Sequence, residues 1–348
     1  MHEKKTAVFY ALLAAALFGI SCPAAKLLIA KISPVLMAGF LYLGAGIGML
    51  LVNLLRRRNF SLEAKITKKE IPYVIGMIVL DIAAPICLLL GLSLSNPANV
   101  SLLSNFEIVA TSLIAFCFFK ESLGWDVVLS LILITAASML ISIEDFSSFS
   151  FSLGSLFVIL ACLCWGMENN CTRMLSLKDP LQVVILKGFG SGLGSLLLAF
   201  LLKECRADYF SVILTLILGF FAYGVSIFFY IKAQRDLGAA RTSAYYAVAP
   251  FIGVILSFFI FQERLTLSFL TASGFMLAGV YLGVAEKHKH YHIHERQEHE
   301  HRHNHADGHH QHFHAEDIKG EHSHSHIHER EEHSHVHTPD LHHIHEHN

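Results

Sequence analysis

Four ionisable side chains lie within stretches of the sequence that are otherwise almost entirely apolar: Asp81, Glu107, Glu168 and Lys187. Placing a charged side chain at the centre of a hydrocarbon layer costs ~2.5–3.5 kcal/mol on insertion scales. Such residues are therefore expected to face one another inside a helical bundle. There they bind a polar ligand or a proton, or they tie helices together. These four positions are the first candidates for chemistry in this chain.

Glu107 has the clearest polar surroundings in the sequence. On a helix it shares one face with Ser104 and Thr111, at spacings of three and four residues. This stripe predicts a carboxylate that faces the interior as a substrate ligand or a proton carrier. Glu168 and Lys187 are expected at similar depth, so they form either a buried tether between helices or part of the same site. The neighbours of Asp81 are mostly apolar, and its role is left open.

The apolar stretches are long enough to cross a membrane. Residues of hydrophobic type make up 53% of the chain, and the runs of about 20 residues match the length that a hydrocarbon core of ~30 Å requires. A soluble domain would instead show amphipathic periods. The sequence predicts an all-α integral membrane protein with spans at about 7–30, 34–55, 71–94, 98–119, 126–143, 152–174, 180–202, 211–233, 239–261 and 266–285.

The distribution of lysine and arginine predicts the orientation of these spans. With the N-terminus inside the cell, sixteen basic residues fall on the cytoplasmic side and five on the outside. Cytoplasmic loops carry the excess of positive charge in membrane proteins. We therefore expect a multi-pass protein of the plasma or inner membrane, with the N- and C-termini in the cytoplasm.

The two halves of the membrane region are related in sequence. Ala98, Ser101 and Glu121 correspond to Ala240, Ser243 and Glu263 at an offset of 142 residues, and each copy contains an apolar run, a charged corner and a second apolar run. Each half has five spans. Because five is odd, the second half is expected to be inverted relative to the first, as in many secondary transporters. The predicted units are residues 1–145, 146–285 and a tail at 286–348.

The second half offers aromatic side chains where the first offers acids. Tyr223 corresponds to Asp81, and Tyr245, Tyr246 and Pro250 lie in the ninth predicted span. Pro250 would free a backbone carbonyl near the midplane. The tyrosines either line a site or pack in the core. A site that is acidic on one side and aromatic on the other would suit a substrate with an amino or cationic group.

The hairpins, the corner glutamates and one motif resemble the EamA-type branch of the drug/metabolite transporter superfamily. The motif A-x-x-S-A-x-x-A-x-x-P-x-x-x-x-x-L-x-x-x-x-x-x-E begins at Ala240 and ends at Glu263. The resemblance covers about residues 7–285. It implies export or exchange of a small metabolite, amino-acid-like or drug-like, without ATP. The absence of a Walker A sequence agrees with that expectation.

The C-terminal tail has a different composition. Of the 24 histidines, 23 lie between His288 and His347, and the tail has few apolar residues to bury, so disorder is expected. Imidazole is a common ligand for zinc, nickel, cobalt and copper. The alternating His-x-His pattern predicts that the tail binds such ions, although no cofactor is required for transport. The candidate ligands are His292, His294, His299, His301, His303, His322, His324, His326, His328, His333, His335 and His337.

Three functions remain open from the sequence. The preferred one is a transporter of a small organic solute, including metal-chelating solutes, with a metal-binding tail. The alternatives are a direct transition-metal permease and a membrane-anchored metal store or sensor that does not transport. The helices contain no pairing of nucleophile and base, so an enzyme is not expected, and the basic residues fit the orientation rule without nucleic-acid binding. The expected partners are the lipid bilayer, a small-molecule substrate and metal ions; a homodimer is left open.

Overall fold

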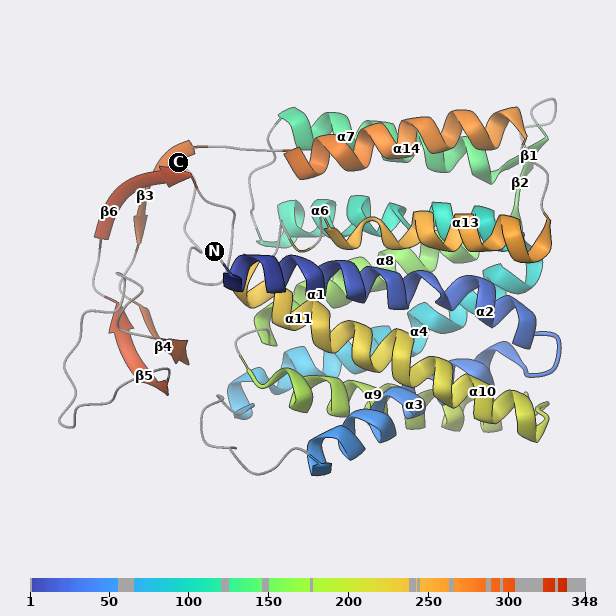
Figure 1. Ribbon diagram of the computed structural model, residues 1–348, viewed down its shortest axis with the longest axis horizontal. Helices are drawn as coiled ribbons and strands as arrows, with labels where there is room; N and C mark the ends of the chain where they lie inside the picture. Colours follow the sequence, from blue (N-terminus) through green and yellow to red (C-terminus); the bar gives the residue numbers. More distant parts are fainter. Residues whose placement is uncertain are drawn as a thin grey trace.

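The computed structural model describes residues 2–55, 66–119, 125–145, 150–175, 178–237, 242, 245–262, 266–285, 289–294, 297–303, 322–328 and 331–336. Within these ranges the chain forms a bundle of helices that lie roughly side by side (Figure 1). The first half contains α1 (His2–Gly19), α2 (Ser21–Leu28), α3 (Pro34–Leu55), η1 (Lys68–Glu70), α4 (Ile71–Leu94), α5 (Pro97–Leu103), α6 (Phe106–Phe119) and α7 (Trp125–Ser142). The second half contains α8 (Leu153–Leu175), α9 (Pro180–Leu201), α10 (Tyr209–Gly219), η2 (Phe220–Val225), α11 (Ser226–Leu237), α13 (Ala249–Phe261) and α14 (Leu267–Ala285).

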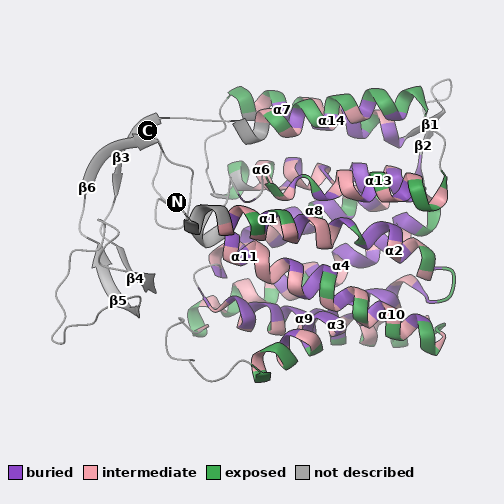
Figure 2. Ribbon diagram, viewed as in Figure 1, coloured by how far each residue is buried: buried purple, intermediate pink, exposed green. Residues whose placement is uncertain are grey.

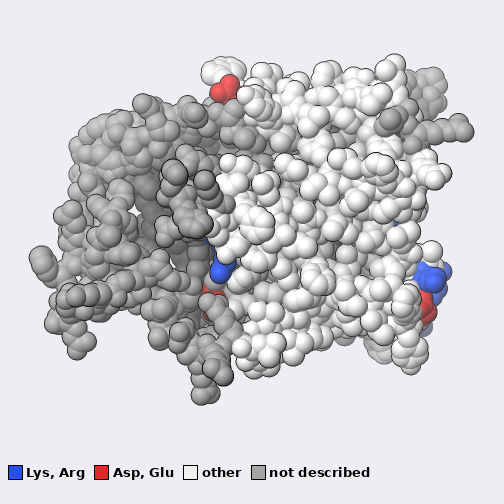
Figure 3. Space-filling model, in the orientation of Figure 1, with Lys and Arg blue, Asp and Glu red and all other residues white. Residues whose placement is uncertain are grey.

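The described helices have the length and composition of membrane spans. Seven helical segments are long and apolar enough to cross a bilayer, and three shorter apolar helices accompany them at Val128–Ser142, Ala249–Phe261 and Leu267–Leu282. Together they correspond to the ten predicted spans. Exposed residues are concentrated toward the outside of the bundle and buried residues toward the surfaces where helices meet (Figure 2). The face seen in Figure 3 is almost free of charged side chains between its two ends, as expected of a surface in contact with lipid. The prediction of an all-helical multi-pass membrane protein is confirmed.

Helices of one half pack against helices of the other in a reciprocal pattern. α4 packs on α8, and the corresponding pair, α1 and α11, are also in contact. Likewise α6 packs on α8 while α13 packs on α1. The pairs α3–α9 and α7–α14 join corresponding helices directly, and α5 packs on α13 where the two corresponding interrupted spans meet. Exchanging the two halves therefore preserves the principal helix contacts, as a duplicated architecture requires. The boundary predicted at residues 145 and 146 falls after β1 (Ile143–Asp145) and before β2 (Ser150–Phe151), which pair as antiparallel strands.

Glycines bring α3 and α9 into close contact. A Cβ atom added to Gly46 would lie 3.0 Å from the backbone nitrogen of Phe189, and one added to Gly188 would lie 2.9 Å from the carbonyl oxygen of Tyr42. Backbone atoms cannot yield as a flexible side chain can. Small residues allow this approach in membranes, where helix association depends on packing because lipid tails are as apolar as the helices.

We predict that Gly188→Ala destabilises the bundle. The added methyl group meets the backbone of α3, and overpacking of this kind costs about 1–3 kcal/mol. The thermal unfolding midpoint in detergent should therefore fall. Gly274→Ala is the matched control, because a Cβ atom at Gly274 has no neighbour within 4 Å and α14 is exposed there. Equal destabilisation of both variants would contradict the packing argument.

Polar contacts hold the connections at one end of the bundle. Lys26 Nζ donates to the carbonyl oxygens of Leu92 at 2.5 Å and Ser95 at 2.7 Å, at the C-terminal end of α4. The carbonyl groups at the C-terminal end of a helix have no backbone N–H donor further along the helix. Lys26 supplies a donor to two of them. Asp208 caps α10 by accepting hydrogen bonds from the backbone and hydroxyl of Ser211, which hold the pKa of its carboxyl below the ordinary value.

Part of the histidine-rich tail forms strands. β3 (Lys289–His294) pairs with β6 (Glu331–Val336), and β4 (Gln297–His303) pairs with β5 (His322–His328), both antiparallel. The His-x-His pattern has the period of two that a β-strand also has, and strand pairing supplies hydrogen bonds for the backbone. The predicted ligand His337 lies outside the described residues.

Candidate functional site

Lys187 lies between two carboxylates in the interior of the bundle. Its Nζ atom is 3.0 Å from Asp81 Oδ2 and 2.9 Å from Glu168 Oε1. The three side chains come from α9, α4 and α8, and they are only 6%, 0% and 3% exposed respectively. The predicted pair of Glu168 and Lys187 is therefore present, and Asp81, whose role the sequence left open, joins it. We refer to Asp81, Glu168 and Lys187 as the triad.

Two hydroxyl groups complete the bonding of the triad. Tyr42 Oη, from α3, donates to Asp81 Oδ1 at 2.8 Å. Thr172 Oγ1 donates to Glu168 Oε1, the same oxygen that Lys187 contacts. Sequence reasoning did not select either residue. Thr172 follows Glu168 by four positions, a spacing that places both on one helix face, whereas Tyr42 had no signal beyond a tyrosine in an apolar span.

Glu107 lies in a second polar network. Asn169 Nδ2, from α8, donates to Glu107 Oε1 at 2.6 Å and to Thr111 Oγ1 at 3.3 Å. The predicted stripe of Glu107 and Thr111 thus faces α8. Ser104, the third member of that stripe, donates its hydroxyl hydrogen to Val100 O in its own helix at 2.8 Å. We refer to Glu107, Asn169 and Thr111 as the Glu107 network.

The two networks meet on α8. Glu168 belongs to the triad and Asn169, the next residue, belongs to the Glu107 network. Consecutive residues on a helix point about a quarter turn apart, so α8 presents one polar group to each network. A rotation or tilt of α8 would consequently change both sets of contacts together.

The helices that carry Glu107 and Pro250 are both interrupted. α5 ends at Leu103 and α6 begins at Phe106, so Glu107 lies in the first turn of α6. In the second half a turn at residues 247–248 precedes α13, with Pro250 in its first turn. The two breaks correspond at an offset of about 142 residues, and α5 packs on α13. Discontinuous helices of this kind form the binding sites of many secondary transporters.

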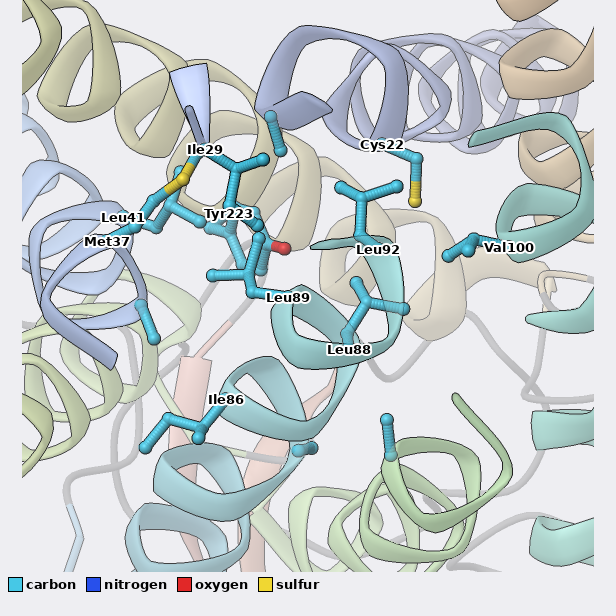
Figure 4. Close-up of a cluster of buried hydrophobic side chains, with 14 of the residues drawn as sticks. Cys22, Ile29, Met37, Leu41, Ile86, Leu88, Leu89, Leu92, Val100 and Tyr223 are labelled. Carbon is cyan, nitrogen blue, oxygen red and sulfur yellow. The ribbon is translucent and has the colours of Figure 1, made fainter. Parts of the chain in front are cut away.

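Aromatic side chains form a continuous cluster beside the triad. Tyr223 lies in the π-helical segment η2. The centroid of its ring is 5.3 Å from the ring centroid of Tyr42 and 5.7 Å from that of Phe18. Phe18 is in turn 5.7 Å from Tyr246, which is 4.9 Å from Tyr230. Figure 4 shows Tyr223 among the buried apolar side chains of the core. Short π-helical segments inside α-helices are frequent at functional sites.

The other residues predicted from the second half differ in their placement. Tyr245 is 37% exposed, unlike Tyr223 at 2%. Tyr245 therefore points away from the interior that Tyr223 occupies. Pro250 is partly buried at the start of α13. The structure thus brings Asp81, Glu168, Lys187 and Tyr223 together, links Glu107 to them through α8, and leaves Tyr245 at the periphery.

Metal-ligating side chains do not gather in the described part of the membrane region. Among the residues that the structure describes, no group of three or more His, Cys, Asp or Glu side chains is arranged to hold a metal ion. Two of the cysteines, whose thiol groups are possible metal ligands, illustrate this: Cys87 is partly buried and Cys117 is exposed.

Comparison with known families identifies the class of the chain. The model of the EamA-like transporter family matches it twice, over residues 5–143 and 152–284. The chain belongs to the EamA-like transporter family. The two matched segments coincide with the two halves that pack reciprocally in the bundle. The protein is accordingly a membrane transporter, as the sequence motifs had implied.

Relatives of this family member extend the comparison without naming a substrate. An uncharacterised transporter from Methanothermobacter thermautotrophicus is 25% identical over 76% of this chain and 82% of its own length. An uncharacterised member of solute carrier family 35 from Schizosaccharomyces pombe is 27% identical, but over 30% of this chain and 22% of its own length. A protein of known crystal structure has a similar fold, with a TM-score of 0.58 and 15% identity over 81% of this chain and 95% of its own.

Proposed function

We propose that this protein is a secondary transporter that exports or exchanges a small organic solute carrying an amino or other cationic group. In this proposal Glu107 binds the cationic group of the solute and a proton alternately. In this proposal the coupling ion is the proton, because carboxylates that lie between helices can bind a proton as well as a cation, and the sequence has no Walker A motif for ATP.

The observation that carries the proposal is the imbalance of charge at the site. Lys187 contacts two carboxylates, Asp81 and Glu168, and a third carboxylate, Glu107, lies in the adjoining network bonded to Asn169. Ionised groups are costly to bury unless opposite charges compensate them. A site with more acids than bases therefore favours positively charged ligands, whether a protonated amine or a proton.

The aromatic cluster and the helix breaks favour an organic substrate. Faces of tyrosine and phenylalanine attract cations and also pack against hydrocarbon. Phe18, Tyr223 and Tyr246 supply such faces within one connected set of rings. The interruptions before α6 and α13 add backbone groups that can bind polar atoms of a solute.

A bare transition-metal ion is a less suitable substrate. The sequence contains no histidine between His2 and His288, and the described membrane residues hold no trio of metal-ligating side chains. Divalent metal ions of this kind are usually bound by imidazole or thiolate ligands. A metal could still cross the membrane as a chelate with an organic solute.

We further propose that the tail binds zinc, nickel, cobalt or copper and that the membrane region places it in the cytoplasm of a plasma or inner membrane protein. The register of β3 with β6 and of β4 with β5 puts histidine opposite histidine at five positions. Such pairs would supply two imidazoles to one ion.

The transport proposal is tested in cells that lack the protein and receive the full chain, a chain that ends at Glu286, or the full chain with Glu107→Gln. We expect the full and shortened chains to release an organic solute that Glu107→Gln does not, with a loss of at least tenfold. The measurement is untargeted metabolite analysis of the medium together with total cell zinc, nickel, cobalt and copper.

Two outcomes would contradict the proposal. A change in cell metal with Glu107→Gln while no metabolite moves would favour a metal permease. Release and metal content that depend on the tail alone, and not on Glu107, would favour a membrane-anchored metal store. Thr271→Val is a matched control, because Thr271 is exposed on α14 and bonds only to Leu267 O in the hydrogen bonds of the described structure.

A further inference from the structure

We propose that the triad binds an exchangeable proton of its own, carried by Asp81, in addition to the cation or proton bound at Glu107. The inference rests on the proposed function, in which the site exchanges protons for a cationic solute. It adds a second proton site and assigns it to one oxygen atom.

Charge balance favours a proton on the triad, separate from any proton bound at Glu107. Lys187 contributes one positive charge, whereas Asp81 and Glu168 contribute two negative charges when both are ionised. All three side chains are at least 94% buried, and an uncompensated buried charge costs several kcal/mol. A single proton on either carboxylate makes the triad neutral. Glu107 cannot supply the compensation because it is itself an acid.

The hydrogen bonds assign this proton to Asp81. Lys187 contacts Oδ2 of Asp81 while Tyr42 bonds to the other oxygen, Oδ1. A tyrosine hydroxyl can donate or accept. When Asp81 takes a proton from a hydronium ion on Oδ1, a neutral water molecule is left and the new O–H group donates to Tyr42 Oη. The Tyr42 hydrogen rotates away, and Lys187 keeps its contact with Oδ2.

Glu168 is less suited to hold the proton. Lys187 and Thr172 both bond to its Oε1 atom. A proton on that oxygen would displace the donor hydrogen atoms of both partners. A proton on Oε2 would have no acceptor among the hydrogen bonds of the described residues, whereas a proton on Asp81 Oδ1 has Tyr42 Oη as its acceptor. Two donors converging on one oxygen instead stabilise the ionised carboxylate.

The groups around each acid are those of the bundle interior. Asp81 faces Tyr42 on α3, Tyr223 on η2, Lys187 on α9, and both Glu168 and Cys171 on α8. Glu107 faces Asn169 and Glu168 on α8, Lys187 on α9, and Cys162 and Tyr246. Glu168 is common to both sets, and it adjoins Asn169. Occupancy of one acid should therefore alter the other through α8.

Infrared difference spectroscopy of the full-length protein in lipid tests the assignment without any knowledge of the solute. The chain has 28 Asp and Glu residues, so spectra are compared above about pH 5.5, where exposed carboxyl groups are already ionised. In that range the carbonyl stretch reports only carboxyl groups that stay protonated in the interior. The wild-type protein should show two titrating groups. Glu107→Gln should remove one and leave the triad signal, whatever its effect on transport.

The conservative pair Tyr42→Phe and Thr172→Val then locates the remaining proton. We expect Tyr42→Phe to shift the carbonyl frequency of the triad signal, because the protonated Asp81 loses its acceptor, and Thr172→Val to leave it in place. Loss of every titrating carboxyl in Glu107→Gln, or a shift with Thr172→Val and none with Tyr42→Phe, would overturn the inference. Either result would leave the transport role of Glu107 untouched.

Discussion

Replacing Lys187 with methionine should destabilise the folded protein by about 3–5 kcal/mol, the usual cost of removing one partner from a buried ion pair. The change leaves Asp81 and Glu168 facing each other in the interior, where each had Lys187 within 3.0 Å. Methionine has a similar volume and no charge, so the loss is electrostatic rather than a loss of packing. Equilibrium unfolding in mixed detergent micelles measures the difference.

The charge explanation has its own control. A triple variant with Lys187→Met, Asp81→Asn and Glu168→Gln keeps the shape of the triad but removes all three charges. Replacing buried ion pairs by neutral groups of similar size is often close to neutral in stability. We therefore expect the triple variant to recover most of the stability. If it is as unstable as Lys187→Met alone, packing and not charge is the reason.

Removal of the tail should abolish high-capacity metal binding by the purified protein. The chain that ends at Glu286 loses 23 of the 24 histidines and retains a membrane region whose described residues contain no metal-binding trio. Zinc and nickel bound after equilibrium dialysis should fall from several ions per chain to none. Binding by the full chain should weaken as pH falls below about 6.5, because metal binding requires neutral imidazole.

A variant whose tail has the same residues in shuffled order tests whether metal binding depends on histidine content or on the pairing of the strands. It keeps every histidine but loses the arrangement in which His299, His301 and His303 of β4 lie opposite His326, His324 and His322 of β5. If the paired register matters, the shuffled tail should bind the same ions several-fold more weakly. Equal affinity would mean that histidine content alone is sufficient, and metal retained by the shortened chain would contradict the assignment to the tail.

The spans, the duplication and the family could be predicted from sequence because each leaves a local record. Long apolar runs follow from the thickness of the bilayer, and the repeat is visible in the correspondence of Ser101 with Ser243 and Glu121 with Glu263. Buried charges are equally conspicuous, since each stands alone in an apolar run. The sequence therefore singled out Asp81, Glu107, Glu168 and Lys187 by their charge within apolar runs, and Thr111 through its spacing from Glu107.

Partnership between those residues was decided by the tertiary structure. Asp81 and Lys187 are more than 100 positions apart, and only the packing of α4, α8 and α9 brings both to Glu168. Tyr42 and Asn169 became site residues for the same reason, because each donates to an acid on another helix. Tyr245 and Tyr246 are adjacent in sequence, yet one is exposed and the other joins the aromatic cluster, a difference set by the rotation of their short helical segment. The amino-acid sequence by itself determined which polar groups must be buried; the helix packing alone determined which groups neutralise them.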